Sequence, residues 1–228
     1  MKMKFGAIVT DGRGKIGGHV ASKNRGGAYL RTKVTPANAQ TSFQNAIRAT
    51  FTILAQAWRG LTEEQRTAWN AAVTDFARTN IFGDLINPSG INLFQRLNNN
   101  LLSVGEAMIS EPPLPAEVGS VVLTSATSAI GAATMTLVFD GPVPANTTVK
   151  VFATAPMSAG KSFVKSEFRQ IGTIAAAGAS PFNVKVLYLA KFGNQGVAGQ
   201  KIFFKLLPVN ITTGQAGAAS STSVISVA

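Results

Sequence analysis

The stretch Glu111-Pro-Pro-Leu-Pro-Ala-Glu117 separates two parts of the chain that differ in hydrophobic pattern. Before it, apolar residues recur every three or four positions, which is typical of helices. After it, apolar and polar residues alternate, which is typical of strands. Its three prolines form a stiff linker through which neither helix nor sheet continues. The sequence therefore predicts an α+β fold with its clearest domain boundary at residues 111–117.

Residues 118–228 are predicted to form an immunoglobulin-like or fibronectin-like β-sandwich, because short alternating segments recur with turn residues between them. The predicted strands are Val121–Ala126, Thr134–Asp140, Thr148–Ala153, Phe168–Ala175, Phe182–Leu189, Lys201–Val209 and Thr222–Val227. The chain has no cysteine, and antibody domains join their sheets with a disulfide, so the fibronectin type is favoured. The basic residues are expected on solvated sheet faces: Lys150, Lys161, Lys165, Arg169, Lys185, Lys191, Lys201 and Lys205.

Residues 35–110 are predicted to form a small three-helix bundle. Thr35 and Pro36 suit the start of a first helix, which Gly60 ends. Its apolar residues share one face at spacings of 4, 4, 3 and 4: Phe43, Ile47, Phe51, Leu54 and Trp58. Short connections between the helices favour their packing together.

The second and third helices also have sequence signals at their ends. Thr62-Glu-Glu-Gln65 is a capping box that begins the second helix. The third carries apolar residues from Ile91 to Val104 and ends at Gly105. Trp58 and Trp69 lie on apolar stripes, so we expect them to hold the first two helices together in a core.

Residues 1–34 are predicted to form an extended, basic, glycine-rich arm. Its seven glycines cost too much conformational entropy for the segment to fold alone. Only Phe5–Val9 and Ala28–Val34 have an extended pattern, so we expect the arm to gain order from a partner. The candidate partner- or nucleic-acid-binding residues are Lys2, Lys4, Arg13, Lys15, Lys23, Arg25, Tyr29, Arg31 and Lys33.

The charge of the chain, formally +11, is concentrated at its two ends. Residues 1–33 hold eight basic residues and one acid, for a net +7. Residues 34–117 hold five basic and seven acidic residues, for a net −2. Residues 118–228 hold eight basic and two acidic residues, for a net +6. This asymmetry indicates an anionic partner. Only 14% of residues are charged, against roughly 25% in an average domain, so we expect much of the surface to be covered by contacts.

The side-chain inventory argues against an enzyme. The lack of cysteine and the single His19 exclude thiol catalysis, cysteine-ligated zinc and a two-histidine metal site within one chain. Gly12-Arg-Gly-Lys-Ile-Gly-Gly matches neither nucleotide-binding loop pattern. Glu63 and Glu64 suit the first turn of a helix, where acids meet its dipole. We therefore expect no catalytic residue, metal, other cofactor or small-molecule substrate.

Several motifs resemble, in the same order, those of an uncharacterised group of bacteriophage and prophage proteins. That group has a Gly-Lys-x-Gly-Gly arm, an Arg-x-Gly-x-Tyr-x-Arg motif and a Leu-Thr-x-x-Gln-Arg-x-x-Trp helix start. The matching stretches are Gly14-Lys-Ile-Gly-Gly-His-Val20, Arg25-Gly-Gly-Ala-Tyr-Leu-Arg31, Pro36-Ala-Asn38, Trp58-Arg-Gly-Leu-Thr-Glu-Glu-Gln-Arg-Thr-Ala-Trp69 and Ser89-Gly-Ile-Asn-Leu-Phe94. Ala39 replaces the proline that usually follows the asparagine. The resemblance implies a virion-associated structural protein without catalytic activity.

These features favour a virion protein that decorates or joins the capsid, portal or tail through its arm and helical bundle. Its partners would be other virion structural proteins and copies of itself. The alternatives are a nucleic-acid-binding virion or packaging protein that uses the basic arm, and host-surface adhesion through the sandwich. No segment has a signal-peptide core or the roughly 20 apolar residues of a membrane span, so we expect synthesis in the host cytoplasm and no membrane partner.

Overall fold

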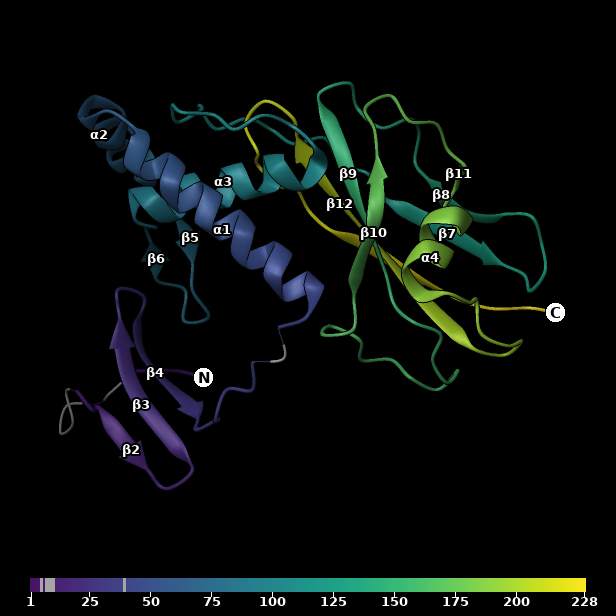
Figure 1. Cartoon of the computed structure of the whole chain (residues 1–228), viewed down its shortest axis with the longest axis horizontal. Coiled ribbons are helices and arrows are strands. Elements are labelled where there is room, and N and C mark those ends of the chain that lie inside the picture. The colour runs from purple at the N-terminus through teal and green to yellow at the C-terminus, as the bar shows by residue number, and fades with distance from the viewer. Residues whose placement is uncertain (5, 7–10, 39) are drawn as a thin grey trace.

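The computed structural model describes residues 1–4, 6, 11–38 and 40–228. Most of the helices and most of the antiparallel strands occupy different parts of the chain (Figure 1), which confirms the predicted α+β class. An N-terminal sheet comes first, helices α1, α2 and α3 follow, and two facing sheets form the C-terminal part.

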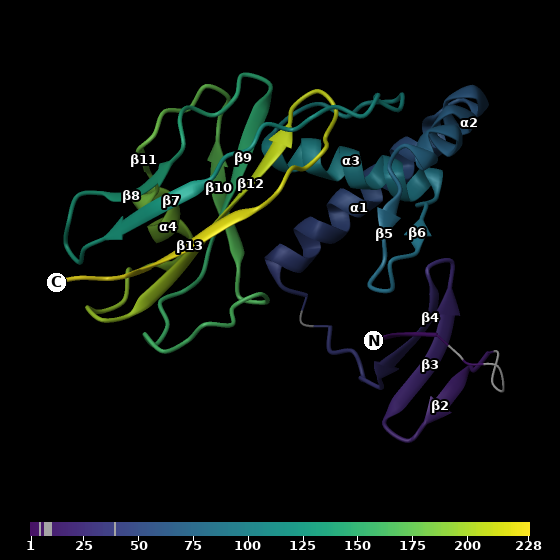
Figure 2. The same ribbon diagram turned by 180° about the vertical axis from the view of Figure 1, so that it is seen from behind.

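The two C-terminal sheets share one hydrophobic core. Their strands are β7 (Leu123–Ser128), β8 (Met135–Phe139), β9 (Thr147–Ala153), β10 (Arg169–Ile174), β11 (Phe182–Asn183), β12 (Lys201–Asn210) and β13 (Ser220–Ile225). One sheet has the order β10-β9-β12-β13 and the other β11-β8-β7. Leu137, Val151 and Phe204 are fully buried between them. At one edge β13 lies beside β7 (Figure 2), where Ala129 bridges Val227.

The predicted strand Phe182–Leu189 is wrong beyond its first residues. Only β11 is extended, and Lys185–Phe192 forms helix α4. Tyr188 is buried in the core and its hydroxyl donates to the carbonyl of Thr154 at 3.0 Å. Val186, which alternation along a strand would place on the same side as Val184, is 77% exposed. A short run of alternating residues also fits a helix, because Val184 and Tyr188 are four positions apart and share its buried side.

The helical part contains α1 (Ser42–Gly60), α2 (Glu63–Ala71), the short 3₁₀ helix η1 (Ala72–Thr74), the hairpin β5 (Arg78–Thr79) and β6 (Leu85–Ile86), and α3 (Gly90–Val104). The capping box of Thr62 and Gln65 begins α2 as predicted. Gly105 ends α3 with a left-handed φ of 88°. The predicted start of α1 at Thr35 is wrong, because Thr41 and Gln44 form its capping box instead.

The helices pack around aromatic residues. Trp69 is fully buried, and its ring meets Phe94 of α3 at a centroid distance of 5.3 Å. The half-buried Trp58 ring lies 5.5 Å from the same phenylalanine. Both tryptophans are therefore part of the core, as expected, and they meet through α3.

Helix α3 also joins the helices to the C-terminal sheets. Asn100 accepts a hydrogen bond from the Lys150 ammonium at 3.0 Å and donates to the carbonyl of Gly214 at 2.9 Å. Lys150 is only 5% exposed, so its predicted place on a solvated face is wrong. Burial lowers its pKa to about 8. The cause is α3, which covers this end of β9 and β12.

The predicted extended arm is a four-stranded antiparallel sheet. Its strands are β1 (Lys2–Met3), β2 (Gly14–Ile16), β3 (His19–Asn24) and β4 (Gly27–Thr32), in the order β1-β4-β3-β2. Gly17 and Gly27 adopt positive φ angles of 54° and 99° at the hairpin turns. The glycines therefore mark turns, not absence of order. The expected extended patch Phe5–Val9 and the turn at Ala39 fall, apart from Gly6, outside the described residues.

Candidate docking surfaces

One face of the N-terminal sheet gathers basic residues. Lys2 lies opposite Tyr29, and in the next row Lys15 and Arg31 both lie opposite Val20. Cross-strand partners and residues two positions apart project to the same side of a sheet. Lys2, Lys15, Tyr29 and Arg31 therefore share one face, which we call the basic face.

The one acid of residues 1–33, Asp11, lies next to basic residues that are not part of the basic face. Its carboxylate lies 3.6 Å from the Arg13 guanidinium and 3.9 Å from the Lys23 ammonium. No described carboxylate forms an ion pair with a lysine or arginine of the basic face. The basic face thus carries positive charge that no described carboxylate pairs with.

Lys4 attaches the sheet to the β5–β6 hairpin. Its ammonium donates to the Asp84 carboxylate at 2.9 Å and lies 5.3 Å from the centroid of the Phe82 ring. Asn80 donates to the other carboxylate oxygen of Asp84. These two hydrogen bonds, that from Lys4 being the larger cause, lower the pKa of Asp84. Asp84 is thus a structural acid of the β5–β6 turn.

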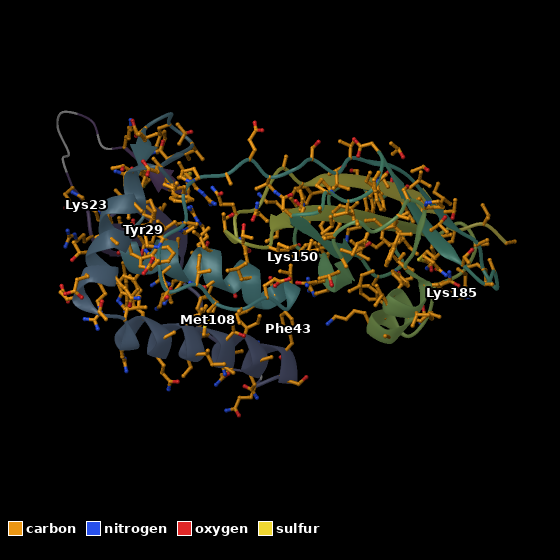
Figure 3. All side chains as sticks on the ribbon, turned by 90° about the horizontal axis from the view of Figure 1, so that it is seen from above. Lys23, Tyr29, Phe43, Met108, Lys150 and Lys185 are labelled. Carbon is orange, nitrogen blue, oxygen red and sulfur yellow. The ribbon has the colours of Figure 1, made fainter. Side chains whose placement is uncertain are left out.

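The remaining predicted binding residues are exposed at the ends of strands. Arg25 lies in the turn between β3 and β4, and Lys33 follows β4. The single histidine of the chain, His19, is not one of these residues and is exposed on β3 opposite Thr32. Figure 3 shows Lys23 and Tyr29 at the same end of the molecule. The structure therefore brings four of the predicted residues to one face and distributes the others around it.

A second surface is the apolar face of α1, defined by Phe43, Ile47 and Phe51. These residues continue the stripe of Leu54 and Trp58, but they are 58%, 43% and 49% exposed, whereas Leu54 is fully buried. Figure 3 shows Phe43 at the end of α1, where its ring lies 5.3 Å from the Lys191 ammonium of α4. Only the second half of the predicted stripe is core.

Helix lengths explain why the first half of the stripe lies outside the core of α2 and α3. Helix α1 has 19 residues, whereas α2 has 9. At 1.5 Å per residue, α1 is about 28 Å long and α2 about 14 Å. The core of α2 and α3 therefore covers Leu54 and Trp58 but not the start of α1. The sequence signal for this difference is the capping box at Thr41, which lies far before the one at Thr62 and therefore indicates a long first helix.

Glu63 and Glu64 lie in the first turn of α2, as expected. Backbone and Thr62 hydrogen bonds lower the pKa of Glu64. Among the described residues, no group of three or more histidine, aspartate or glutamate side chains is placed to hold a metal ion. None of the described helices combines the length and apolarity needed to cross a membrane.

No family model, curated protein or solved structure matches this chain. The functional inference therefore depends on the basic face and the apolar face of α1.

Proposed function

We propose that this chain is a non-enzymatic structural protein of a bacteriophage particle, which attaches to the capsid, portal or tail through the apolar face of α1 and the N-terminal sheet. The observation that carries this proposal is the exposed row Phe43, Ile47 and Phe51. Full burial of a fully exposed side chain of this kind is worth about 1.5–3 kcal/mol, and covering the exposed half of each of these residues is worth roughly half of that. The low charged fraction of the chain and its motifs similar to phage proteins support the same function.

The N-terminal sheet offers a second point of attachment. Strand β2 is at the outer edge of the sheet, and its three residues are exposed. An edge strand leaves backbone donors and acceptors that a strand of a neighbouring subunit can pair with. Two separate contacts on one chain raise the overall affinity for a symmetric lattice beyond that of either contact.

We infer further that residues 118–228 form a fibronectin-like sandwich and that α1, α2 and α3 act as a three-helix bundle. The strand order β11-β8-β7 opposite β10-β9-β12-β13 supports the sandwich, since it matches a seven-strand Greek-key arrangement. The shared contact of Trp58 and Trp69 with Phe94 supports the bundle. In this arrangement the helical bundle attaches to the capsid, portal or tail, and the sandwich extends away from the particle surface.

Sedimentation of particles from cells that produce the phage tests the attachment. Replacing Phe43, Ile47 and Phe51 together by serine removes the apolar face of α1. A matched control replaces Leu114, Phe163 and Val186, which are exposed elsewhere, by serine. We expect the natural chain and the control in the particle fraction and the α1 variant outside it. Equal incorporation of both variants, or absence of the natural chain from particles, would overturn the proposal.

The uncompensated charge of the basic face favours one second candidate, a nucleic-acid-binding protein of the virion. Five basic residues of this region have no ion pair with a described carboxylate: Lys2, Lys15, Arg25, Arg31 and Lys33. Five phosphate contacts predict a log–log salt slope of about −4.5 on duplex DNA. Fluorescence anisotropy across a salt series would measure it, with the double variant Lys15→Gln, Arg31→Gln for comparison. A flat salt response would exclude this candidate.

A further inference from the structure

Two arginines outside the basic face line a pair of adjoining hollows. Arg78 comes from β5 and Arg96 from α3. With Lys2 they line a hollow of about 270 Å³ between the first strand and the β5–β6 hairpin. They also line a second hollow of about 230 Å³, on the side of Phe76 and Asp75. The two guanidinium groups therefore lie together at a concave surface.

Three cations line the two hollows, and the acids near them are fewer: Asp75 lines the second hollow, and the charge of Lys2 helps to lower the pKa of Asp84. No described carboxylate forms an ion pair with Arg78, Arg96 or Lys2. Asp84, the acid of the hairpin, is bonded to Lys4 and Asn80. Burial and, to a smaller extent, the charge of Arg78 lower the pKa of Arg96, yet arginine remains protonated in proteins. The cations outnumber the carboxylates and form no ion pair with them, and this excess positive charge favours binding of an anion.

Arg96 is held in place from one side. Its guanidinium carbon lies 5.8 Å from the centroid of the Phe76 ring, and the side chain is half-buried. A guanidinium group that is already oriented loses less conformational entropy on binding than a free surface side chain. Arg78 and Lys2 are exposed and can adjust to a ligand.

We propose that Arg78, Arg96 and Lys2 form a binding site for a phosphate group. Guanidinium groups match the oxygens of phosphate with paired hydrogen bonds. Phosphate is preferred to a carboxylate because its additional oxygens accept from three cations at once. A water molecule takes up ~30 Å³, so the hollow is large enough to hold a phosphate group together with water molecules bound to it. The phosphate belongs either to a free anion or to the backbone of a single-stranded nucleic acid. This site is separate from the apolar face of α1.

Calorimetric titration of the full chain with pyrophosphate at fixed ionic strength tests the site. We expect saturable binding that Arg78→Gln and Arg96→Gln each weaken about tenfold. Arg59→Gln, which removes an exposed arginine at the far end of α1, is the matched control and should bind as the natural chain does. Because Arg96 packs on Phe76, the exposed Arg78 provides the variant that leaves the core intact.

Anisotropy with a short single-stranded oligonucleotide distinguishes the two sources of phosphate. Binding of pyrophosphate that depends on Arg78 assigns the site to a free anion. Oligonucleotide binding that depends on Arg78, without measurable pyrophosphate binding, assigns it to a nucleic-acid backbone. If neither ligand binds, or if Arg78→Gln binds both as tightly as the natural chain, the proposal is wrong.

Discussion

The N-terminal sheet and the C-terminal pair of sheets are both antiparallel, yet they bury very different amounts of apolar surface. Among the described residues of the N-terminal sheet, only Ala21 and Ala28 are buried. The C-terminal sheets enclose a continuous core with fully buried residues such as Met135 and Phe204. Hydrogen-bonded strands without a core are marginally stable in water. The N-terminal sheet is therefore the part that gains most from contact with a partner.

Charge differs between the two regions in the same way. Lys15 and Arg31 are exposed on the basic face, whereas Lys150 is buried between α3 and the C-terminal sheet. An exposed cation keeps its hydration, but a buried one loses it and depends on its hydrogen-bond partner. The free energy of unfolding should therefore depend on mutation and pH at Lys150, and hardly at all on the exposed Lys15 and Arg31.

Removal of a core side chain should have the largest effect. Phe204→Ala should lower the free energy of unfolding by about 3–5 kcal/mol, because it leaves a cavity between the C-terminal sheets. Leu30→Ala, in the partly exposed β4, should cost less than about 1 kcal/mol. Urea denaturation followed by circular dichroism measures both. A similar cost for the two variants would remove the contrast between the regions.

A methyl group at Gly214 should separate α3 from the C-terminal sheets. Gly214 has a φ of 70°, and an added Cβ would collide with the carbonyl oxygen of Leu97. Gly214→Ala should cost about 2 kcal/mol or more from backbone strain and this collision together. Gly199→Ala isolates the strain, since Gly199 has a φ of 85° and open space around it. Equal thermal stability of the two variants would contradict the tight contact with α3.

The buried Lys150 should make stability depend on alkaline pH. Its pKa is about 8 in the folded chain and about 10.4 when unfolded, so the unfolded chain binds more protons between these values. The free energy of unfolding should therefore rise from pH 8 to pH 10.4, by no more than about 3 kcal/mol. Lys150→Met should lack this rise, and Lys165→Met, at an exposed lysine, should retain it. Parallel pH profiles for all three proteins would show that Lys150 is not buried as a cation.

Loss of a basic-face cation should have the smallest effect on stability. Arg31→Gln should change the free energy of unfolding by less than about 0.5 kcal/mol, because Arg31 is exposed and has no ion pair with a described carboxylate. Thermal unfolding at low and high salt measures this. A loss above 1 kcal/mol would indicate a structural role for the guanidinium.

The features predicted correctly depend on residues that are close together in the sequence. The capping box at Thr62 and the alternation in Lys201–Val209 are local patterns, and the structure has α2 and β12 there. The same reasoning, applied to Thr41 and Gln44, predicts the start of α1. The error at Thr35 came from preferring proline at the first helical turn to a capping box six residues later.

The features that were missed depend on residues distant in the sequence. The burial of Lys150 requires α3, whose Asn100 lies 50 positions earlier. The exposure of Phe43 and Phe51 depends on where α2 and α3 end, which a helical stripe alone does not indicate. The arginine hollow brings together β5 and α3, and neither Arg78 nor Arg96 belongs to a recognisable motif.

Hydrogen–deuterium exchange of the free chain and of the chain bound to particles tests the attachment most directly. The proposed function predicts that binding slows exchange of the backbone amides in the N-terminal sheet and in the first half of α1. Exchange in the C-terminal sheets should not change. Protection confined to the C-terminal sheets, with α1 and the N-terminal sheet exchanging as in the free chain, would contradict it.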